Sequence, residues 1–330
     1  MSRKDRKPAT LKDIAAEAGV SVNTASLALR ESPRISGETR KRVHRIARRM
    51  QYVPNSAARN LARKRSGLIG IYTRALYDAV RTRLINRLFA ELHTAEYRPI
   101  LGLAENANDP WYASPWMRTF QELKVEALVV VVEGVDRLHR WPARVPTVLV
   151  GCQPMESLQC DYLGLDRREG AKLGVAHLVA RGHKKILVAC AEKADFAQGC
   201  FEQIAAAGLQ AMSVNLTQPS DEKRLHAVLD FLAGTTEKPT AAIFGDSPLA
   251  AQFMHRMEEL GYRVPGDIAV VGYDYFPWAD MLKTSLTTVE QPIAEMASEA
   301  VKMIRARLAD LNCPPMRMVL PHRLVVRESA

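Results

Sequence analysis

The sequence has no long hydrophobic run and no export signal. No stretch of about eighteen apolar residues occurs in the 330 residues, so no segment is long enough to cross a membrane as a helix. The N-terminus is basic, but it lacks the apolar core and the small-residue cleavage site of a secretory signal peptide. These absences predict a cytoplasmic protein.

Cysteines are few, and enzyme motifs are missing. No Cys-x-x-Cys pair and no histidine cluster with metal-ligand spacing occurs, so we expect no metal, no cofactor and buried free thiols. Gly67-Leu-Ile-Gly70 is not a dinucleotide fingerprint, and Gly-x-Ser-x-Gly and P-loop motifs are missing, which argues against an enzyme. The cysteines are Cys152, Cys160, Cys190, Cys200 and Cys313.

Positive charge is concentrated in the first fifth of the chain. Residues 1–66 carry 17 Lys and Arg against 5 Asp and Glu, whereas residues 67–330 carry 29 against 31. A basic patch confined to one small domain is typical of a protein that binds a polyanion. A solvated basic tail is the alternative, but this segment also has helical periodicity and helix caps. The 47% hydrophobic content predicts a sizeable core for the chain as a whole.

Two short helices joined by a glycine-containing turn are predicted near the N-terminus. Thr10 is a suitable N-cap with Asp13 three residues later, and Gly19 fits the left-handed conformation that ends a helix. Ser21 caps a second helix over residues 22–30. Two helices around a three-residue turn are the signature of a helix-turn-helix.

The second helix has one face for packing and one face for contact. At about 100° per residue, Ala25, Ala28 and Leu29 cluster on one side and can pack on the first helix. The opposite side can enter a major groove, where asparagine pairs with adenine, an apolar side chain contacts a thymine methyl and arginine meets phosphate. The exposed set is Asn23, Ser26, Leu27 and Arg30, with Val22 at its edge.

A third helix, capped by Ser36, combines an apolar stripe with a basic surface. Val43, Ile46, Ala47 and Met50 form the stripe. The basic side chains could simply be solvated, but beside a helix-turn-helix we expect at least some of them to contact phosphate. They are Arg40, Lys41, Arg42, Arg45, Arg48 and Arg49.

Beyond residue 66, apolar strands alternate with helical segments. Strands are predicted at 68–72, 127–132, 147–151, 185–189, 241–244 and 268–272, with helices at 80–96 and 168–181. Such alternation predicts parallel sheets with ligand sites at the carboxyl ends of strands. Because the stretch is too long for one small sheet, we expect two similar lobes.

These motifs together resemble the lac-repressor (LacI/GalR) family. The head matches at residues 10–30, 35–40 and 52–55, and the remainder matches at 161–171, 177–186, 264–274, 286–292 and 324–329. The resemblance implies an α-helical head followed by an α/β two-lobed domain like that of periplasmic binding proteins. It implies that Val22, Asn23 and Leu27 read bases. It also implies that five residues lie at or near contacts with the DNA backbone, namely Thr10, Ser21, Thr24, Ser26 and Arg30. Leu27 and Arg30 depart from the residues usual in the family, which leaves the target sequence open.

A hinge is expected between the two domains. Pro54 prevents the third helix from continuing, so a separate short helix, marginal on its own, would start after it. By the resemblance, this helix enters the minor groove and Leu61 wedges between base pairs. Alternatively, Leu61 packs as a linker residue on the next domain. The hinge residues assigned to DNA are Asn55, Ala58, Arg59 and Leu61.

The resemblance also implies a ligand cleft between the lobes, with Asp274, Tyr72 and Phe196 at it. Phe196 falls where the family has an arginine that holds sugar hydroxyls. Asp274 falls where the family holds a ligand hydroxyl, although a capping role in a turn fits equally well. Aromatic residues could stack on a sugar ring but are more often packing residues. They are Trp111, Tyr112, Trp116 and Trp278.

The sequence therefore predicts a DNA-binding transcriptional repressor, with a head at 1–54, a hinge at 55–66 and a two-lobed domain at 67–330. We expect a homodimer on a near-palindromic operator, modulated by a small, sugar-related effector. A dimeric regulator that senses no small molecule is the alternative. An exported solute receptor is disfavoured by the basic head and the missing signal peptide.

Overall fold

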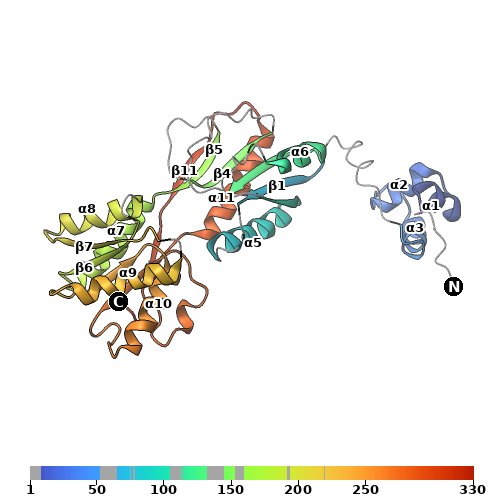
Figure 1. The fold of residues 1–330 in the computed structure, drawn as a ribbon. Helices are drawn as coiled ribbons and strands as arrows, with labels where there is room; N and C mark the ends of the chain where they lie inside the picture. Colours follow the sequence, from blue (N-terminus) through green and yellow to red (C-terminus); the bar gives the residue numbers. More distant parts are fainter. Residues whose placement is uncertain are drawn as a thin grey trace. The chain divides into compact units, whose positions relative to one another are not determined.

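The computed structural model describes residues 9–52, 65–74, 76, 79–104, 112, 114–131, 145–152, 160–191, 194–218 and 220–330. The chain divides into two compact units, Met1–Ser66 and Gly67–Ala330, which are described separately (Figure 1). The first unit is helical, and the second consists of two α/β lobes.

The first unit, hereafter the head, is a cluster of three helices around a small core. The helices are α1 (Leu11–Ala18), α2 (Val22–Leu29) and α3 (Gly37–Arg49). Each helix contributes residues at helical spacing to the core, because only one stripe of each helix is apolar. The core consists of Ile14, Ala15, Ala18, Ala25, Ala28, Val43, Ile46 and Ala47.

The first lobe contains a six-stranded parallel sheet in the order β11-β5-β4-β3-β1-β2. Its strands are β1 (Leu68–Thr73), β2 (Arg98–Leu103), β3 (Ala127–Val131), β4 (Thr147–Cys152), β5 (Asp161–Leu165) and β11 (Arg317–Leu320). Its helices are α5 (Ala79–Thr94), α6 (Pro115–Glu122) and α11 (Ile293–Ala309). Successive residues of β1 face opposite sides, so Ile69 and Ile71 pack with α5 and α11 while Tyr72 packs with α6. Both faces of the sheet are therefore covered, as parallel sheets require.

The second lobe contains a six-stranded sheet in the order β12-β10-β9-β8-β6-β7, in which β12 alone is antiparallel to its neighbour. Its strands are β6 (Ile186–Cys190), β7 (Ala211–Asn215), β8 (Ala241–Phe244), β9 (Ala269–Tyr273), β10 (Thr287–Glu290) and β12 (Arg323–Val325). Its helices are α7 (Arg167–Ala180), α8 (Asp195–Ala206), α9 (Asp221–Gly234), α10 (Ser247–Glu259) and the short η3 (Ala279–Met281). One face of the sheet is covered by α7 and α8, and the other by α9 and α10.

Within the described part of the chain, the backbone crosses between the lobes at three places. It leaves β5 for α7 at Asp166, leaves β10 for α11 at residues 291–292, and passes from β11 to β12 at residues 321–322. As a result α11, late in the chain, packs against α5 in the first lobe (Figure 1). Each lobe is thus assembled from separate stretches of sequence. The three crossovers form a hinge between the two lobes, which is distinct from the hinge segment predicted at 55–66.

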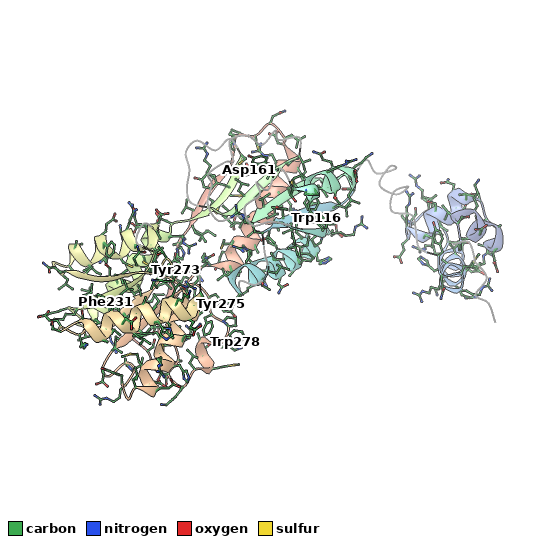
Figure 2. All side chains as sticks on the ribbon, viewed as in Figure 1. Trp116, Asp161, Phe231, Tyr273, Tyr275 and Trp278 are labelled. Atoms are coloured by element: carbon green, nitrogen blue, oxygen red, sulfur yellow. The ribbon has the colours of Figure 1, made fainter. Side chains whose placement is uncertain are left out.

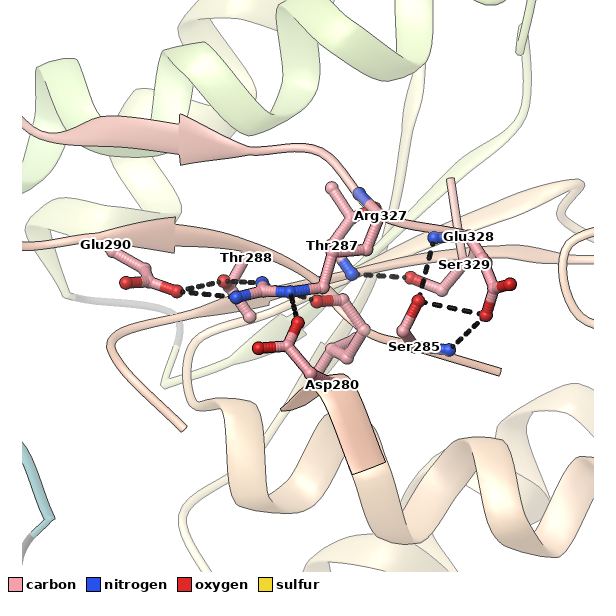
Figure 3. A network of polar contacts seen from close by, with 9 residues as sticks. Asp280, Ser285, Thr287, Thr288, Glu290, Arg327, Glu328 and Ser329 are labelled. Atoms are coloured by element: carbon pink, nitrogen blue, oxygen red, sulfur yellow. Dashed lines mark hydrogen bonds and ion pairs between the residues drawn. The ribbon is translucent and has the colours of Figure 1, made fainter. Parts of the chain in front are cut away.

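The end of the chain is held in the second lobe by a polar network (Figure 3). The Arg327 guanidinium donates to the Leu286 carbonyl at 2.9 Å and to the Thr288 hydroxyl at 2.8 Å, and it pairs with Asp280 and Glu290. These contacts tie η3 and β10 to the last residues, because one planar guanidinium can satisfy several acceptors at once.

The expectation of buried free thiols is confirmed for Cys190 and Cys200 only. Cys160 and Cys313 are half-buried, and the side chain of Cys152 lies outside what the structure describes. Burial raises the pKa of Cys190 to about 12, because an apolar surrounding disfavours the thiolate. This thiol is therefore held in its unreactive protonated form.

Candidate DNA interface and candidate ligand site

A reciprocal cap fixes the start of α1. The Thr10 hydroxyl accepts from the backbone N–H of Asp13 at 3.4 Å, and the Asp13 carboxylate accepts from the backbone N–H of Thr10 at 2.8 Å. The hydrogen bonds that the backbone N–H and the hydroxyl of Thr10 donate to this carboxylate lower the pKa of Asp13. The capping box predicted from the sequence is therefore formed.

The turn between α1 and α2 is set by Gly19 and Ser21. Gly19 has a φ of 62°, and its N–H donates to the carbonyls of Ala15 and Ala16 at the end of α1. The Ser21 hydroxyl accepts from the backbone N–H of Thr24 at 3.0 Å and caps α2. This turn and cap fix the direction in which α2 leaves α1.

The described members of the predicted DNA-binding set are accessible on α2 and its ends. Ala25 and Ala28 are fully buried, so they fix which side of α2 faces the core. The opposite side remains available to a ligand: Val22, Asn23 and Arg30 are exposed, as are the caps Thr10 and Ser21, whereas Thr24, Ser26 and Leu27 are half-buried. The hinge members Asn55, Ala58, Arg59 and Leu61 lie outside the described residues.

The basic surface of α3 surrounds an apolar face that belongs to the core. Val43 is fully buried, and Ile46 and Ala47 are buried beside it. Lys41, Arg42, Arg45, Arg48 and Arg49 are exposed. Arg49 pairs with Glu17 of α1, which leaves most of this positive charge without an internal carboxylate partner in the described part of the head.

In the two-lobed unit, the end of β9 is the meeting point of all three crossovers. The Gln291 amide donates to the Asp274 carboxylate at 2.8 Å, and the Arg167 guanidinium lies 3.5 Å from the same carboxylate. The Tyr273 hydroxyl hydrogen-bonds Nε2 of His322 at 2.7 Å. Asp274 has a φ of 73°, and the Ser247 hydroxyl donates to its carbonyl at 2.7 Å. We call Arg167, Tyr273, Asp274, Gln291 and His322 the hinge cluster.

Burial determines the ionisation of the hinge cluster. Burial, together with the nearby charge of Arg167, lowers the pKa of His322 to about 4. Burial and the charge of Asp274 raise the pKa of Tyr273. Both side chains are consequently neutral near neutral pH, and their hydrogen bond joins the β11–β12 crossover to β9.

Phe196 and Tyr72, both assigned to the ligand site, lie inside the lobes. Phe196 is only 3% exposed, and its ring meets Tyr273 edge-on with 4.8 Å between centroids. Tyr72 is 1% exposed within the first-lobe core that includes Phe120 and Leu128. Of the three assigned residues, only Asp274 has a partly accessible side chain, with 21% of its surface exposed.

The aromatic residues considered as ring-stacking groups differ in their surroundings (Figure 2 labels Trp116 and Trp278). Trp116 is half-buried and contacts Phe120 at 5.8 Å between centroids, and Tyr112 is half-buried beside the same core. Trp278 is 58% exposed and meets Phe276 edge-on at 5.6 Å. Trp111 lies outside the described residues. None of the described three joins the hinge cluster, so packing explains Tyr112 and Trp116.

Comparison with known proteins identifies both parts of the chain. Residues 10–55 match the model of bacterial regulatory proteins of the lacI family, and residues 175–330 match a periplasmic binding protein-like domain. The chain has the LacI-family head and the periplasmic-binding-like domain of LacI/GalR transcriptional regulators. These homologues are DNA-binding regulators and not enzymes.

The similarity extends over nearly the whole length of individual LacI/GalR relatives. The chain is 27% identical over 320 residues to the transcriptional repressor PurR of Vibrio atlanticus (strain LGP32), covering 92% of each chain. It is 27% identical over 332 residues to the transcriptional regulator GalR of Escherichia coli (strain K12), covering 97% of this chain and 95% of that one. It shares the fold of the lac repressor dimer bound to operator and the anti-inducer ONPF, with a TM-score of 0.82, 24% identity and coverage of 98% and 99%.

Sequence reasoning missed four members of the hinge cluster in this chain. Asp274 was identified, but Arg167, Tyr273, Gln291 and His322 were not. The available signal was positional: Gln291 and His322 lie in crossovers between the lobes, and Arg167 directly follows the crossover at Asp166. Recognising this signal requires knowledge of the strand order in the two sheets, which the hydrophobic periodicity of the sequence does not contain.

The described residues contain neither a membrane-spanning helix nor a metal-binding group. No described helix is long and apolar enough to span a bilayer. No group of three or more His, Cys, Asp or Glu side chains in the same residues is arranged to hold a metal ion.

Proposed function

We propose that this chain is a LacI/GalR repressor that binds a specific, near-palindromic operator as a homodimer. The observation that carries the proposal is the accessible side of α2, where Val22, Asn23 and Arg30 are exposed while Ala25 and Ala28 hold the helix to the core. A helix held this way presents one set of side chains to a major groove. The domain boundaries proposed are a head at 1–54, a hinge at 55–66 and a two-lobed domain at 67–330.

Selection of bound duplexes from a random pool tests this function. We expect a near-palindromic site, and we expect Asn23→Ala to relax base preference at one position in each half-site at a cost of about 1–3 kcal/mol. The control is Lys12→Ala, an exposed change on α1 outside the proposed contact set. It should leave the selected sequence unchanged, and any loss of affinity should be equal for all duplexes. Recovery of no consensus, or of the same consensus with Asn23→Ala, would contradict the proposed role.

In the hinge, we propose that Asn55, Ala58 and Arg59 contact DNA and that Leu61 wedges into the minor groove. The support is the family resemblance and the general use of apolar side chains to unstack and kink DNA. The earlier alternative, in which Leu61 packs as a linker residue, stays open.

We further propose that a small, sugar-related effector binds between the lobes and acts through the hinge cluster. Asp274 would accept a hydrogen bond from the ligand, while Phe196 and Tyr72 would shape the site from behind its surface. Support comes from the position of Asp274, which all three crossovers surround. A ligand that makes different contacts in two arrangements of the lobes can shift the balance between them.

Thermal unfolding with a panel of monosaccharides and less polar derivatives tests for such an effector. A ligand bound only to the folded state at 100 times its Kd stabilises it by about 2.7 kcal/mol. We expect a shift that Asp274→Asn abolishes and the exposed control Asp230→Asn retains. A shift that survives Asp274→Asn would place the ligand elsewhere.

A regulator that senses no small molecule is the second candidate, and one observation favours it. The Asp274 carboxylate already has Gln291 and Arg167 as partners, while Tyr72 and Phe196 are buried. The hinge cluster would then only hold the lobes together. The absence of a thermal shift across the panel would support this candidate.

A further inference from the structure

A groove on the surface of the head is lined by four cationic side chains, together with one histidine, one glycine and one glutamate. It has a volume of about 590 Å³, which falls in the range of small-molecule sites. Its lining residues are Glu31, Gly37, Arg40, Lys41, His44, Arg45 and Arg48. None of the residues assigned to operator contact on α2 lines it, so the groove is separate from the proposed base-reading surface.

The helical period places the groove on the side of α3 that faces away from the core. At 100° per residue, Lys41, His44, Arg45 and Arg48 fall on one side, opposite Val43. From Arg40 to Arg48 the helix rises by about 12 Å, so these side chains can surround one compact ligand. Arg42 falls on the other flank and does not line the groove.

Positive charge exceeds negative charge in the groove, where Glu31 is the one acidic lining residue. Arg40 donates to the Glu31 carbonyl at 3.3 Å, and among the described residues Lys41, Arg45 and Arg48 form no ion pair with a carboxylate. The second unit is different: there, helix-surface cations pair with carboxylates three or four residues away, as in Arg87–Glu91, Arg118–Glu122 and Lys302–Glu299.

This arrangement disfavours α3 unless an anion is present. Lys41–Arg45 and Arg45–Arg48 are like-charge neighbours at helical spacing, and such pairs destabilise a helix. The helix dipole favours cations only in the last turn, so it helps Arg48 but not Arg40 or Lys41. An anion in the groove would relieve this repulsion through charge-assisted hydrogen bonds.

We propose that this groove binds a free anion that carries two or more adjacent phosphate groups. Several cations around a hollow suit a compact polyanion that enters it, and a guanidinium fork matches phosphate geometry. A bound polyphosphate would place negative charge on the head and oppose its approach to DNA. By reciprocity, operator binding would lower the affinity of the head for the anion by the same factor. This regulatory consequence rests on the proposed operator function, whereas binding of the anion does not.

Titration of the full chain with inorganic tripolyphosphate at constant ionic strength, without DNA, tests the site. We expect saturable binding of one anion per chain and much weaker binding of orthophosphate. The double variant Arg45→Ala, Arg48→Ala should lose about tenfold or more in affinity, equivalent to about 1.4 kcal/mol. The control Arg34→Ala, Arg42→Ala removes the same charge from the head outside the groove and should retain the affinity. Hydrogen exchange should show protection of α3 amides on binding, and circular dichroism of both variants confirms that they fold.

Two outcomes would overturn the proposal. Equal loss in both double variants would mean that diffuse charge, rather than the groove, attracts the anion. Absence of saturable tripolyphosphate binding, together with equal weakening of operator and scrambled duplexes by Arg45→Ala, Arg48→Ala, would assign the groove to the DNA backbone. Because the anion is titrated without DNA, either failure leaves the operator-selection result unaffected.

Discussion

His322 lies in the last crossover, where its side chain is 6% exposed and hydrogen-bonded to Tyr273. It is a neutral histidine held inside the hinge, between a segment of each lobe. A protonated imidazole there would lack water and would lie near the positive charge of Arg167. The hinge between the lobes is therefore most stable while His322 remains unprotonated.

We expect the two-lobed unit to lose stability as the pH falls from about 6.5 to about 4. The pKa of His322 is lowered from 6.5 to about 4, so in this window the unfolded chain binds the proton and the folded chain does not. Stability is thus fully present above the unfolded pKa and is lost as the pH falls, by at most about 3.4 kcal/mol at 1.36 kcal/mol per pH unit. Denaturant unfolding at several pH values measures it.

A matched pair of variants isolates this histidine. His322→Gln should flatten the pH dependence between these values, whereas the exposed change His93→Gln should preserve it. An unchanged slope in His322→Gln would mean that other groups titrate in the window.

Single residues of the head were predictable because their contacts are local. Thr10 and Asp13 are three residues apart, and so are Ser21 and Thr24, so each cap is visible in a short stretch of sequence. The hinge cluster was not predictable in this way. Arg167 and Asp274 are more than a hundred residues apart, and only the folded sheet order brings them together.

At the scale of elements, the turn between α1 and α2 determines how the head presents its contact helix. Gly19 takes the left-handed conformation, and no heavy atom lies within 4 Å of where its Cβ would be. The glycine is therefore required by the backbone angle and not by crowding. A side chain here would strain the turn while touching nothing.

We expect Gly19→Ala to destabilise the head by about 1–2 kcal/mol, the cost of the left-handed conformation for a residue with a Cβ. Hydrogen exchange of the α1 and α2 amides in the full chain measures the loss. Gly37→Ala is the control, because Gly37 has an ordinary φ at the first position of α3 and equally open space. It should leave protection unchanged or raise it slightly. Equal loss in both variants would mean that glycine flexibility, and not the angle of Gly19, matters.

Buried strands with a continuous apolar run were predictable as elements, whereas the edge strands and the buried strands β5 and β10, which contain polar residues, were not. The predicted strand at 127–132 is observed as β3, whose five residues are all buried. In contrast, exposed residues alternate with half-buried or buried ones in β7, at the edge of the second sheet, and with half-buried ones in β11, at the edge of the first. β7 pairs with β6 and β11 pairs with β5, and this pairing stabilises strands that their own sequences do not specify.

At the scale of the whole molecule, large apolar side chains remain uncovered on the second lobe. Trp278 is 58% exposed and Met281 is 80% exposed, in and beside η3, which Arg327 ties to the lobe through Asp280. Exposed apolar side chains grouped on a fixed element are typical of an association surface. They support the proposed homodimer.

We expect sedimentation to show a dimer, and we expect Met281→Glu to weaken it, because a symmetric interface would bury the new charge twice. The control is Leu311→Glu, which adds the same charge at a 63% exposed position in the first lobe. It should leave the dimer intact. A monomeric parent would refute the dimer, and a Met281→Glu dimer as tight as the parent would move its interface away from η3.

The three crossovers also determine the order in which the protein can be completed during synthesis. The three helices and the core of the head are complete once residue 52 has been made, but the first lobe waits for α11 and for β11, which ends at Leu320. At about 5–20 residues per second, the ribosome needs roughly 13 to 54 seconds for the intervening chain. During that interval the nascent chain carries a complete basic head and a first lobe whose sheet lacks its last strand. A regulator built in this order can reach DNA with its head before either lobe is able to respond to a signal.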